Sequence, residues 1–203
     1  MDEKTSVQAL DRTAPILPLP PGTPQRATHD DTRHGTTNLY AALEVASGKV
    51  ISQLTARHRA IEFNRFLDRI DQQLPARLDV HLICDNSSTH KTPAIERWLL
   101  RHPRFQLHFT PTYSSWLNLV ERWFAELTSK WLRRSRHRSV AELEQASQAW
   151  IDTWNQDPRP FVWTKTADQI LDTLASYCQR INDSEHQHAT TWHSPEAAVR
   201  GGW

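Results

Sequence analysis

Three acidic residues of this chain have the type and spacing for chemistry on a phosphodiester bond. Asp85 ends the short apolar run at 82–84, Glu121 lies on the flank of a predicted apolar helix, and Asp2 stands near the start. Carboxylates that converge without a built-in cation bind hard divalent ions, and such ions catalyse phosphoryl transfer. We therefore predict a metal site built from Asp2, Asp85 and Glu121.

Asp85 and Glu121 each have a simpler interpretation, which the sequence leaves open. Asp85 begins the run Asp-Asn-Ser-Ser, so it also fits a polar turn in which it caps the next helix. Glu121 sits at the rim of an apolar stripe, where an unpaired buried charge is costly. A partner Arg or Lys is the commoner solution there, and a divalent metal shared with Asp85 is the alternative.

His90 and a run of basic residues are candidates for contacts with nucleic acid. His90 follows Asp85 at the mouth of the next helix, where it could contact a phosphate or shape the site; a capping or surface role is the alternative. The densest basic run suits a phosphate backbone, although a solvated face is the usual explanation of such a run. It consists of Lys130, Arg133, Arg134, Arg136 and Arg138, with His137 among them.

The elements that must position these residues alternate between strands and helices. Hydrophobic periodicity predicts a hairpin of strands at 37–45 and 50–55, a helix at 60–74, a strand at 79–85, a helix at 93–100, a strand at 105–109, and helices at 115–133, from 139 onward and at 166–181. No strand is predicted within 1–11, and 13–37 is predicted to be a proline-rich loop. This order indicates a mixed α/β layer with helices against a central sheet.

Composition narrows the class of protein. A chain of 203 residues with 38% hydrophobic content is long enough for one domain with a real core. The 24 Lys and Arg nearly balance 23 Asp and Glu, so the net charge of the chain gives no indication of nucleic-acid binding. Two cysteines give no disulfide framework, which favours a reducing, cytoplasmic location. No apolar run approaches the ~18 residues of a membrane span.

Three blocks of the sequence together resemble the DDE transposases of bacterial insertion sequences, in the mariner-like branch of that superfamily. They are Asp-Glu-Lys at 2–4, Ile-Cys-Asp-Asn-Ser-Ser-Thr-His at 83–90, and Thr-Pro-Thr-Tyr-Ser-Ser-Trp-Leu-Asn-Leu-Val-Glu-Arg-Trp-Phe at 110–124. The resemblance covers roughly residues 1–175. It implies an RNase H-like fold, with a mixed central sheet flanked by helices, in which the first strand, the fourth strand and a later helix present Asp, Asp and Glu.

The resemblance also implies an activity, its cofactors and its partners. Asp2, Asp85 and Glu121 would bind two Mg²⁺ or Mn²⁺ ions in the catalytic domain of a transposase. Paired ions of this kind activate water or a 3′-hydroxyl and stabilise the leaving oxygen, here in DNA cleavage and strand transfer. The implied partners are the terminal repeats of an insertion sequence, target DNA and further copies of the chain in a DNA complex, with no membrane.

Two departures from the family pattern lead us to expect a truncated chain. Family members usually carry helix-turn-helix modules before the catalytic domain, and apolar residues should precede the first Asp; neither precedes Asp2 here. We therefore expect an incomplete first strand with Asp2 on a fraying end. We assign the catalytic domain to 1–181 and a flexible tail to 182–203.

Two other functions remain open at this point. The chain could be a catalytically dead remnant that only binds DNA or multimerises with full-length transposase. It could also be another RNase H-like nuclease, such as a junction resolvase.

Overall fold

The computed structural model describes residues 1–12, 31–111, 118–160, 168–169, 172 and 175–176. The chain divides into two compact units, Met1–Phe161 and Val162–Trp203. The described residues of the second unit are helical and fall within the helix predicted at 166–181. The rest of that predicted helix, and the tail predicted at 182–203, lie outside the described residues. All elements discussed below belong to the first unit.

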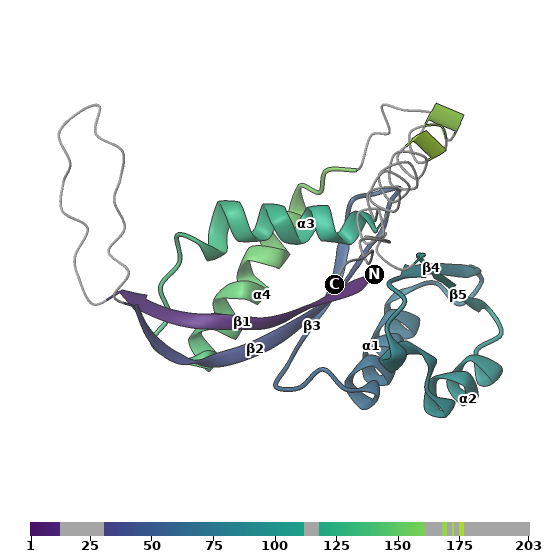
Figure 1. The fold of residues 1–203 in the computed structure, drawn as a ribbon, viewed down its shortest axis with the longest axis horizontal. Coiled ribbons are helices and arrows are strands. Elements are labelled where there is room, and N and C mark those ends of the chain that lie inside the picture. The colour runs from purple at the N-terminus through teal and green to yellow at the C-terminus, as the bar shows by residue number, and fades with distance from the viewer. Residues whose placement is uncertain (13–30, 112–117, 161–167, 170–171, 173–174, 177–203) are drawn as a thin grey trace, which may run out of the picture. The chain divides into compact units, whose positions relative to one another are not determined.

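Three antiparallel strands form the larger sheet, in the order β1 (Asp2–Arg12), β2 (Asp31–Leu43) and β3 (Val50–Thr55) (Figure 1). The hairpin predicted at 37–45 and 50–55 is confirmed by β2 and β3. The prediction of no strand within 1–11, and of a loop reaching to 37, is wrong. Residues 31–36 are fully exposed, so no hydrophobic alternation marks them, and their pairing with β1 places them in the sheet.

Helices cover both faces of this sheet, as the alternation along β2 shows. Tyr40 and Ala42 pack in a core with α1 (Ala60–Gln73), whose Phe63 and Phe66 lie 6.4 and 5.5 Å from the Tyr40 ring. The neighbouring side chains Leu39 and Ala41 belong to a second core on the opposite face, with α3 (Leu119–Leu127) and α4 (Val140–Gln156). Figure 1 shows α3 and α4 together on one side of β1 and β2.

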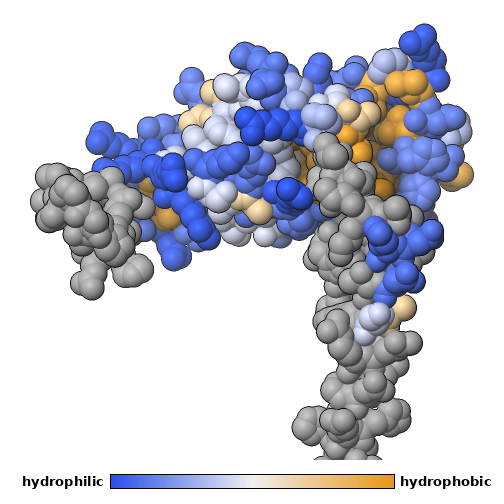
Figure 2. All heavy atoms as spheres, turned by 90° about the horizontal axis from the view of Figure 1, so that it is seen from above, coloured by the Kyte–Doolittle hydropathy of each residue, from blue (hydrophilic) through white to orange (hydrophobic). Residues whose placement is uncertain are grey.

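A parallel pair of strands forms the second sheet. β4 (Val80–Cys84) runs beside β5 (Phe105–Phe109), and the chain between them carries the short helical turn η1 (Ser88–Lys91) and helix α2 (Pro93–Arg101). Pro93 opens α2, where its missing N–H is not needed. Hydrophobic residues gather at the right of Figure 2, the end that carries β4 and β5 in Figure 1, and Ile83 is 48% exposed.

The two sheets meet at the beginning of β1, where the Met1 nitrogen donates a hydrogen bond of 2.6 Å to the Ile83 carbonyl oxygen. The antiparallel sheet and the parallel sheet are thus linked by this hydrogen bond. Met1 is buried and packs in the core with Tyr40 and α1. The predicted mixed α/β architecture with flanking helices is confirmed.

The helical part of the chain agrees with the sequence except near 118 and 128. The helix predicted at 115–133 begins at Leu119, so the prediction is wrong at Asn118, the N-cap, and 115–117 lie outside the described residues. It continues as a π-helical turn, η3 (Thr128–Leu132), which hydrophobic periodicity does not reveal. Ser139 caps α4 by accepting from Glu142 N at 3.1 Å. In the part of the chain described here, no helix combines the length and the apolar character needed to cross a bilayer.

Candidate active site

Asp2 is the first residue of β1 and is buried, with 5% of its surface exposed. Its Oδ1 accepts from Glu3 N at 2.8 Å and its Oδ2 accepts from Asn118 Nδ2 at 3.1 Å. The same Asn118 nitrogen donates to the Met1 carbonyl oxygen at 2.9 Å. The expectation that Asp2 lies on a fraying end is therefore wrong, because Met1 and Asn118 hold the beginning of β1.

Asp85 lies directly after β4, as the sequence predicts, and its carboxylate is 35% exposed. The alternative that Asp85 caps the following helical turn is wrong. That cap is Ser87, whose hydroxyl accepts from Thr89 N at 3.4 Å. The Asp85 carboxylate is thus not committed to a cap and lies beside His90.

Glu121 lies in the first turn of α3 and is exposed. Its charge stays hydrated, so burial does not force a basic partner on it, contrary to the argument from the apolar stripe. The acid that bears the cost of burial is Asp2.

The carboxylates of Asp85 and Glu121 lie close enough to Asp2 for their charges to affect its pKa. Burial, together with the negative charges of Asp85, Glu121 and Glu3, raises the pKa of Asp2 from 3.8 to about 7, against the lowering effect of the Glu3 N–H. Strand β1, the end of β4 and the first turn of α3 therefore bring their carboxylates within electrostatic reach of one another. This arrangement concentrates negative charge around a buried acid.

His90 lies in η1 and is 1% exposed, against the edge of this group. Its Nε2 lies 3.3 Å from Glu3 Oε2 and its Nδ1 lies 3.0 Å from Asp85 Oδ1. Burial lowers the pKa of His90, but the contact with Glu3 and the charges of Glu3 and Asp85 outweigh it, so the pKa is raised overall. The buried ring is not placed to contact a phosphate and is not on the surface, and Ser87 is the cap of η1, so of the roles considered for His90, shaping the site fits this structure.

The donor set suits a hard divalent cation. Glu3, Asp85 and His90 each offer a ligand atom, and these atoms lie within 4.8 Å of one another. Of the three predicted ligands, Asp85 belongs to this group, whereas Asp2 and Glu121 do not. Oxygen-rich groups of this kind match the preference of Mg²⁺ and Mn²⁺ for carboxylate ligands. The residues present therefore fit the metal that the family resemblance implies.

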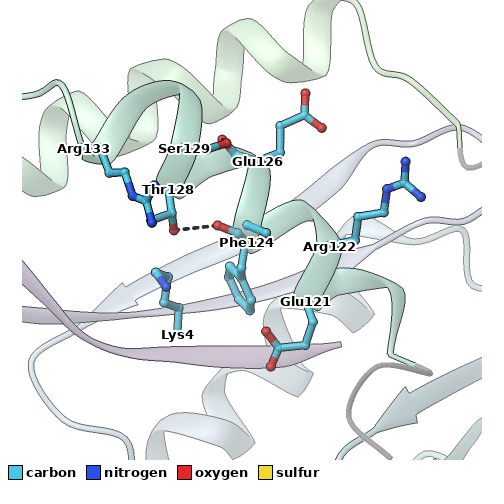
Figure 3. Close-up of a pocket in the computed structure, with 9 residues that line it drawn as sticks. Lys4, Glu121, Arg122, Phe124, Glu126, Thr128, Ser129 and Arg133 are labelled. Carbon is cyan, nitrogen blue, oxygen red and sulfur yellow. Dashed lines mark hydrogen bonds between the residues drawn. The ribbon is translucent and has the colours of Figure 1, made fainter. Parts of the chain in front are cut away.

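An open hollow of about 640 Å³ adjoins Glu121 along α3. In Figure 3, Lys4 of β1 and Arg133, just after η3, extend toward the same part of it, whereas Arg122 points away. Asp2 and Lys4 are two positions apart on β1, so their side chains lie on the same face of the strand. The hollow thus joins two basic side chains to the candidate metal site.

Of the predicted basic run, only Arg133 is among the described residues that line this hollow. Arg133 lines the hollow with Glu121. Lys130 pairs with Glu126, and Arg138 Nε lies 3.6 Å from Asp11 Oδ2. Arg134 and Arg136 are exposed beyond η3. The structure therefore places Arg133 beside the acids and distributes the other four along the connection to α4.

Two residues of the site were missed by reasoning on the sequence alone. Asn118 is the N-cap residue of α3, yet its side chain makes no cap and holds Met1 and Asp2 instead. Glu3 sits beside Asp2 and reaches His90 from the other face of β1. Asn118 lies inside the helix predicted at 115–133, so the signal for either residue in the sequence was its place inside a family-like block.

Comparison with known proteins identifies the family of the chain. The family model described as DDE superfamily endonuclease matches residues 1–144. An uncharacterised 39 kDa protein of insertion element IS630 from Shigella sonnei is 29% identical over 112 residues, covering 55% of this chain and 30% of that protein. The chain thus spans less than a third of the length of this curated relative.

The fold is also found in a solved structure. The crystal structure of the Mos1 strand transfer complex contains a chain that matches with a TM-score of 0.57 and 20% identity, covering 78% of this chain and 47% of that one. The likeness supports the RNase H-like fold class. The predicted resemblance to mariner-like transposases is confirmed, and the chain belongs to the DDE superfamily endonuclease family.

Proposed function

We propose that this chain is the catalytic domain of a transposase, which cleaves DNA and transfers strands at the ends of an insertion sequence with the help of divalent metal ions. The observation that carries the proposal is that Asp85, after β4, and Glu121, in α3, lie within electrostatic reach of the buried Asp2 of β1. Family membership supports endonuclease chemistry.

Asp2, Asp85 and Glu121 are the residues proposed to hold two Mg²⁺ or Mn²⁺ ions. When bound, such ions activate an attacking oxygen and stabilise the leaving oxygen of a phosphodiester. The protein's own contribution is to fix the ligands. Asn118 holds the Asp2 carboxylate, and β4 ends directly before Asp85. Burial of Asp2 excludes water from one side of the site.

The DNA backbone is proposed to leave the metal site along the hollow beside α3. Lys4 and Arg133 are placed to contact its phosphates next to Glu121. The contact is proposed to extend toward α4 through the remaining basic residues, which are Lys130, Arg134, Arg136 and Arg138. The proposed partners are terminal repeats, target DNA and further copies of the chain, and the proposed location is the cytoplasm, where such DNA lies.

A metal-dependent nicking assay on DNA carrying the element's terminal repeats tests the proposal. We expect cleavage with Mg²⁺ or Mn²⁺, and its loss by at least 100-fold in Asp85→Asn and Glu121→Gln, because each removes a charged ligand. Glu96→Gln is the matched control, since Glu96 is an exposed acid on α2, away from the site. Cleavage that persists unchanged in both site variants would sink the proposal.

The remnant hypothesis is less favoured because Asp2, the residue whose placement it doubted, begins β1 and is buried. The same assay decides the matter, because a remnant would bind DNA and cleave none. A preference for branched DNA over terminal repeats would favour the junction resolvase instead.

A further inference from the structure

The strongest feature that the proposed chemistry does not use is the contact of His90 with two carboxylates. The ring is 1% exposed and stacks on Phe63 of α1, with ring centroids 4.0 Å apart. Its two nitrogens face Glu3 at 3.3 Å and Asp85 at 3.0 Å. Glu3 Oε2, Asp85 Oδ1 and His90 Nε2 are buried and have no well-aligned hydrogen-bond partner, so these contacts are close charge contacts.

The position of the ring matters because β1 and β4 belong to different ladders. The Met1–Ile83 hydrogen bond links the strands at one point. Side chains of Asp2 and Glu3 leave β1 on opposite faces. Asn118 holds Asp2 on one face, and His90 holds Glu3 on the other while also contacting Asp85. The imidazole therefore connects the strand that carries Asp2 to the turn that carries Asp85.

We propose that His90 is a positioning residue that sets the Asp85 carboxylate relative to Asp2 before any metal binds. The proposal rests on the proposed function, since Asp85 is a ligand only there. Phe63 stacks on the ring and Glu3 contacts Nε2, while Nδ1 contacts both the Asp85 carboxylate at 3.0 Å and the Asp85 carbonyl oxygen at 3.5 Å. Partners of this kind behind metal ligands typically contribute 10- to 100-fold in metal affinity, by orienting the ligand.

The test uses His90→Phe, which keeps the stacking surface on Phe63 and removes both charge contacts. Because this variant leaves Glu3 buried beside an apolar ring, the double variant His90→Phe with Glu3→Gln removes the unpaired acid as well. His102→Phe is the matched control, since His102 stacks on Trp98 at 3.9 Å and faces Asp71 at 3.9 Å, away from the site. His90→Gln, which keeps a donor toward Asp85, is the rescue.

Two measurements on the intact chain decide the outcome. In calorimetry, the dissociation constant for Mn²⁺ should rise roughly 10- to 100-fold in the double variant. It should rise less in His90→Gln and stay unchanged in His102→Phe. Hydrogen exchange without metal should show faster exchange of the amides at 85–90 in the double variant, with exchange in α4 unchanged.

Amide exchange and Mn²⁺ affinity that both match wild type in the double variant would overturn the positioning role. If wild type itself binds no Mn²⁺, the proposed function fails, and the metal-free exchange measurement still decides whether His90 holds the turn. An effect on melting temperature alone, with exchange at 85–90 equal to wild type, would reduce His90 to a packing residue and also overturn the proposal.

Discussion

The burial of the Asp2 carboxylate lowers the free energy of unfolding. A carboxylate that is 5% exposed and surrounded by other acids is poorly stabilised as an anion. The native state tolerates it because Asn118 Nδ2 and Glu3 N donate to its two oxygens. Sites that bind cations commonly hold such disfavoured charge, because the ligand relieves it.

This balance predicts a pH dependence of stability. The folded-state pKa of Asp2 is raised from 3.8 to about 7, so the folded chain binds more protons than the unfolded chain between these values. Stability from this residue is therefore intact below about pH 4 and is lost as the pH rises through 7. Asp2→Asn should remove that loss, stabilising the metal-free chain at pH 8 by at most about 4 kcal/mol.

Chemical denaturation at pH 4 and pH 8, without metal, measures this effect. Asp31→Asn is the control, since Asp31 is exposed on β2. Asp2→Asn and wild type should converge at pH 4 and separate at pH 8. If the two differ equally at both values, Asp2 is not the source of the pH dependence.

At the scale of residues, the sequence predicts the acids but not what holds them. Asp85 is predictable because an apolar strand must end before a polar turn, and Glu121 because helical periodicity places it beside the apolar face. The roles of Asn118, Glu3 and His90 depend on contacts between residues far apart in the chain. Asn118 and Asp2, for example, meet only after α3 packs beside the start of β1.

At the scale of elements, β1 and α3 border the proposed path of a bound DNA strand. Lys4 and Arg133 reach the same hollow from two elements, and Glu121 lies at its margin. Thr128, whose hydroxyl donates to the Phe124 carbonyl oxygen at 2.7 Å, lies at the junction of α3 and the π-helical turn that lines the hollow. The π turn directs the chain so that Arg133 lies beside the hollow.

Loss of Lys4 or Arg133 should weaken DNA binding without changing the metal site. Lys4→Gln and Arg133→Gln should each lower the slope of log binding constant against log salt concentration by about 1, as expected for one phosphate contact. Fluorescence anisotropy with labelled DNA at several salt concentrations measures the slope. Lys49→Gln, in the exposed turn between β2 and β3, is the control; a slope unchanged from wild type in both hollow variants would remove them from the DNA path.

The elements themselves were predictable where burial is one-sided. Helix α1 buries Phe63, Phe66, Leu67 and Ile70 at helical spacing, so its bounds follow from the sequence. Strand β1 was missed because its apolar residues are few and small, Val7 and Ala9 among polar neighbours. The exposed half of β2 was missed because pairing, which is a long-range property, is what makes it a strand.

At the scale of the whole molecule, the site lies where two separately stabilised layers meet. One core joins α1, α2 and the parallel sheet, and the other joins α3, α4 and the antiparallel sheet, with β2 contributing to both. Asp85 belongs to the first layer and Glu121 to the second, while Asp2 begins the strand between them. The site is therefore complete only when both layers are folded against β1.

A bound ion should accordingly stabilise the fold as a whole. Ligand that binds only the folded state raises the free energy of unfolding by about 2.7 kcal/mol at ~100 times its dissociation constant. We expect Mn²⁺ to raise the melting temperature of wild type and of Glu96→Gln in a single cooperative transition. Asp85→Asn should show no such rise, because it removes the ligand from the first layer. A rise confined to one of two separate transitions would show instead that the ion is held within one layer, and the proposed ligand set would have to be redrawn around it.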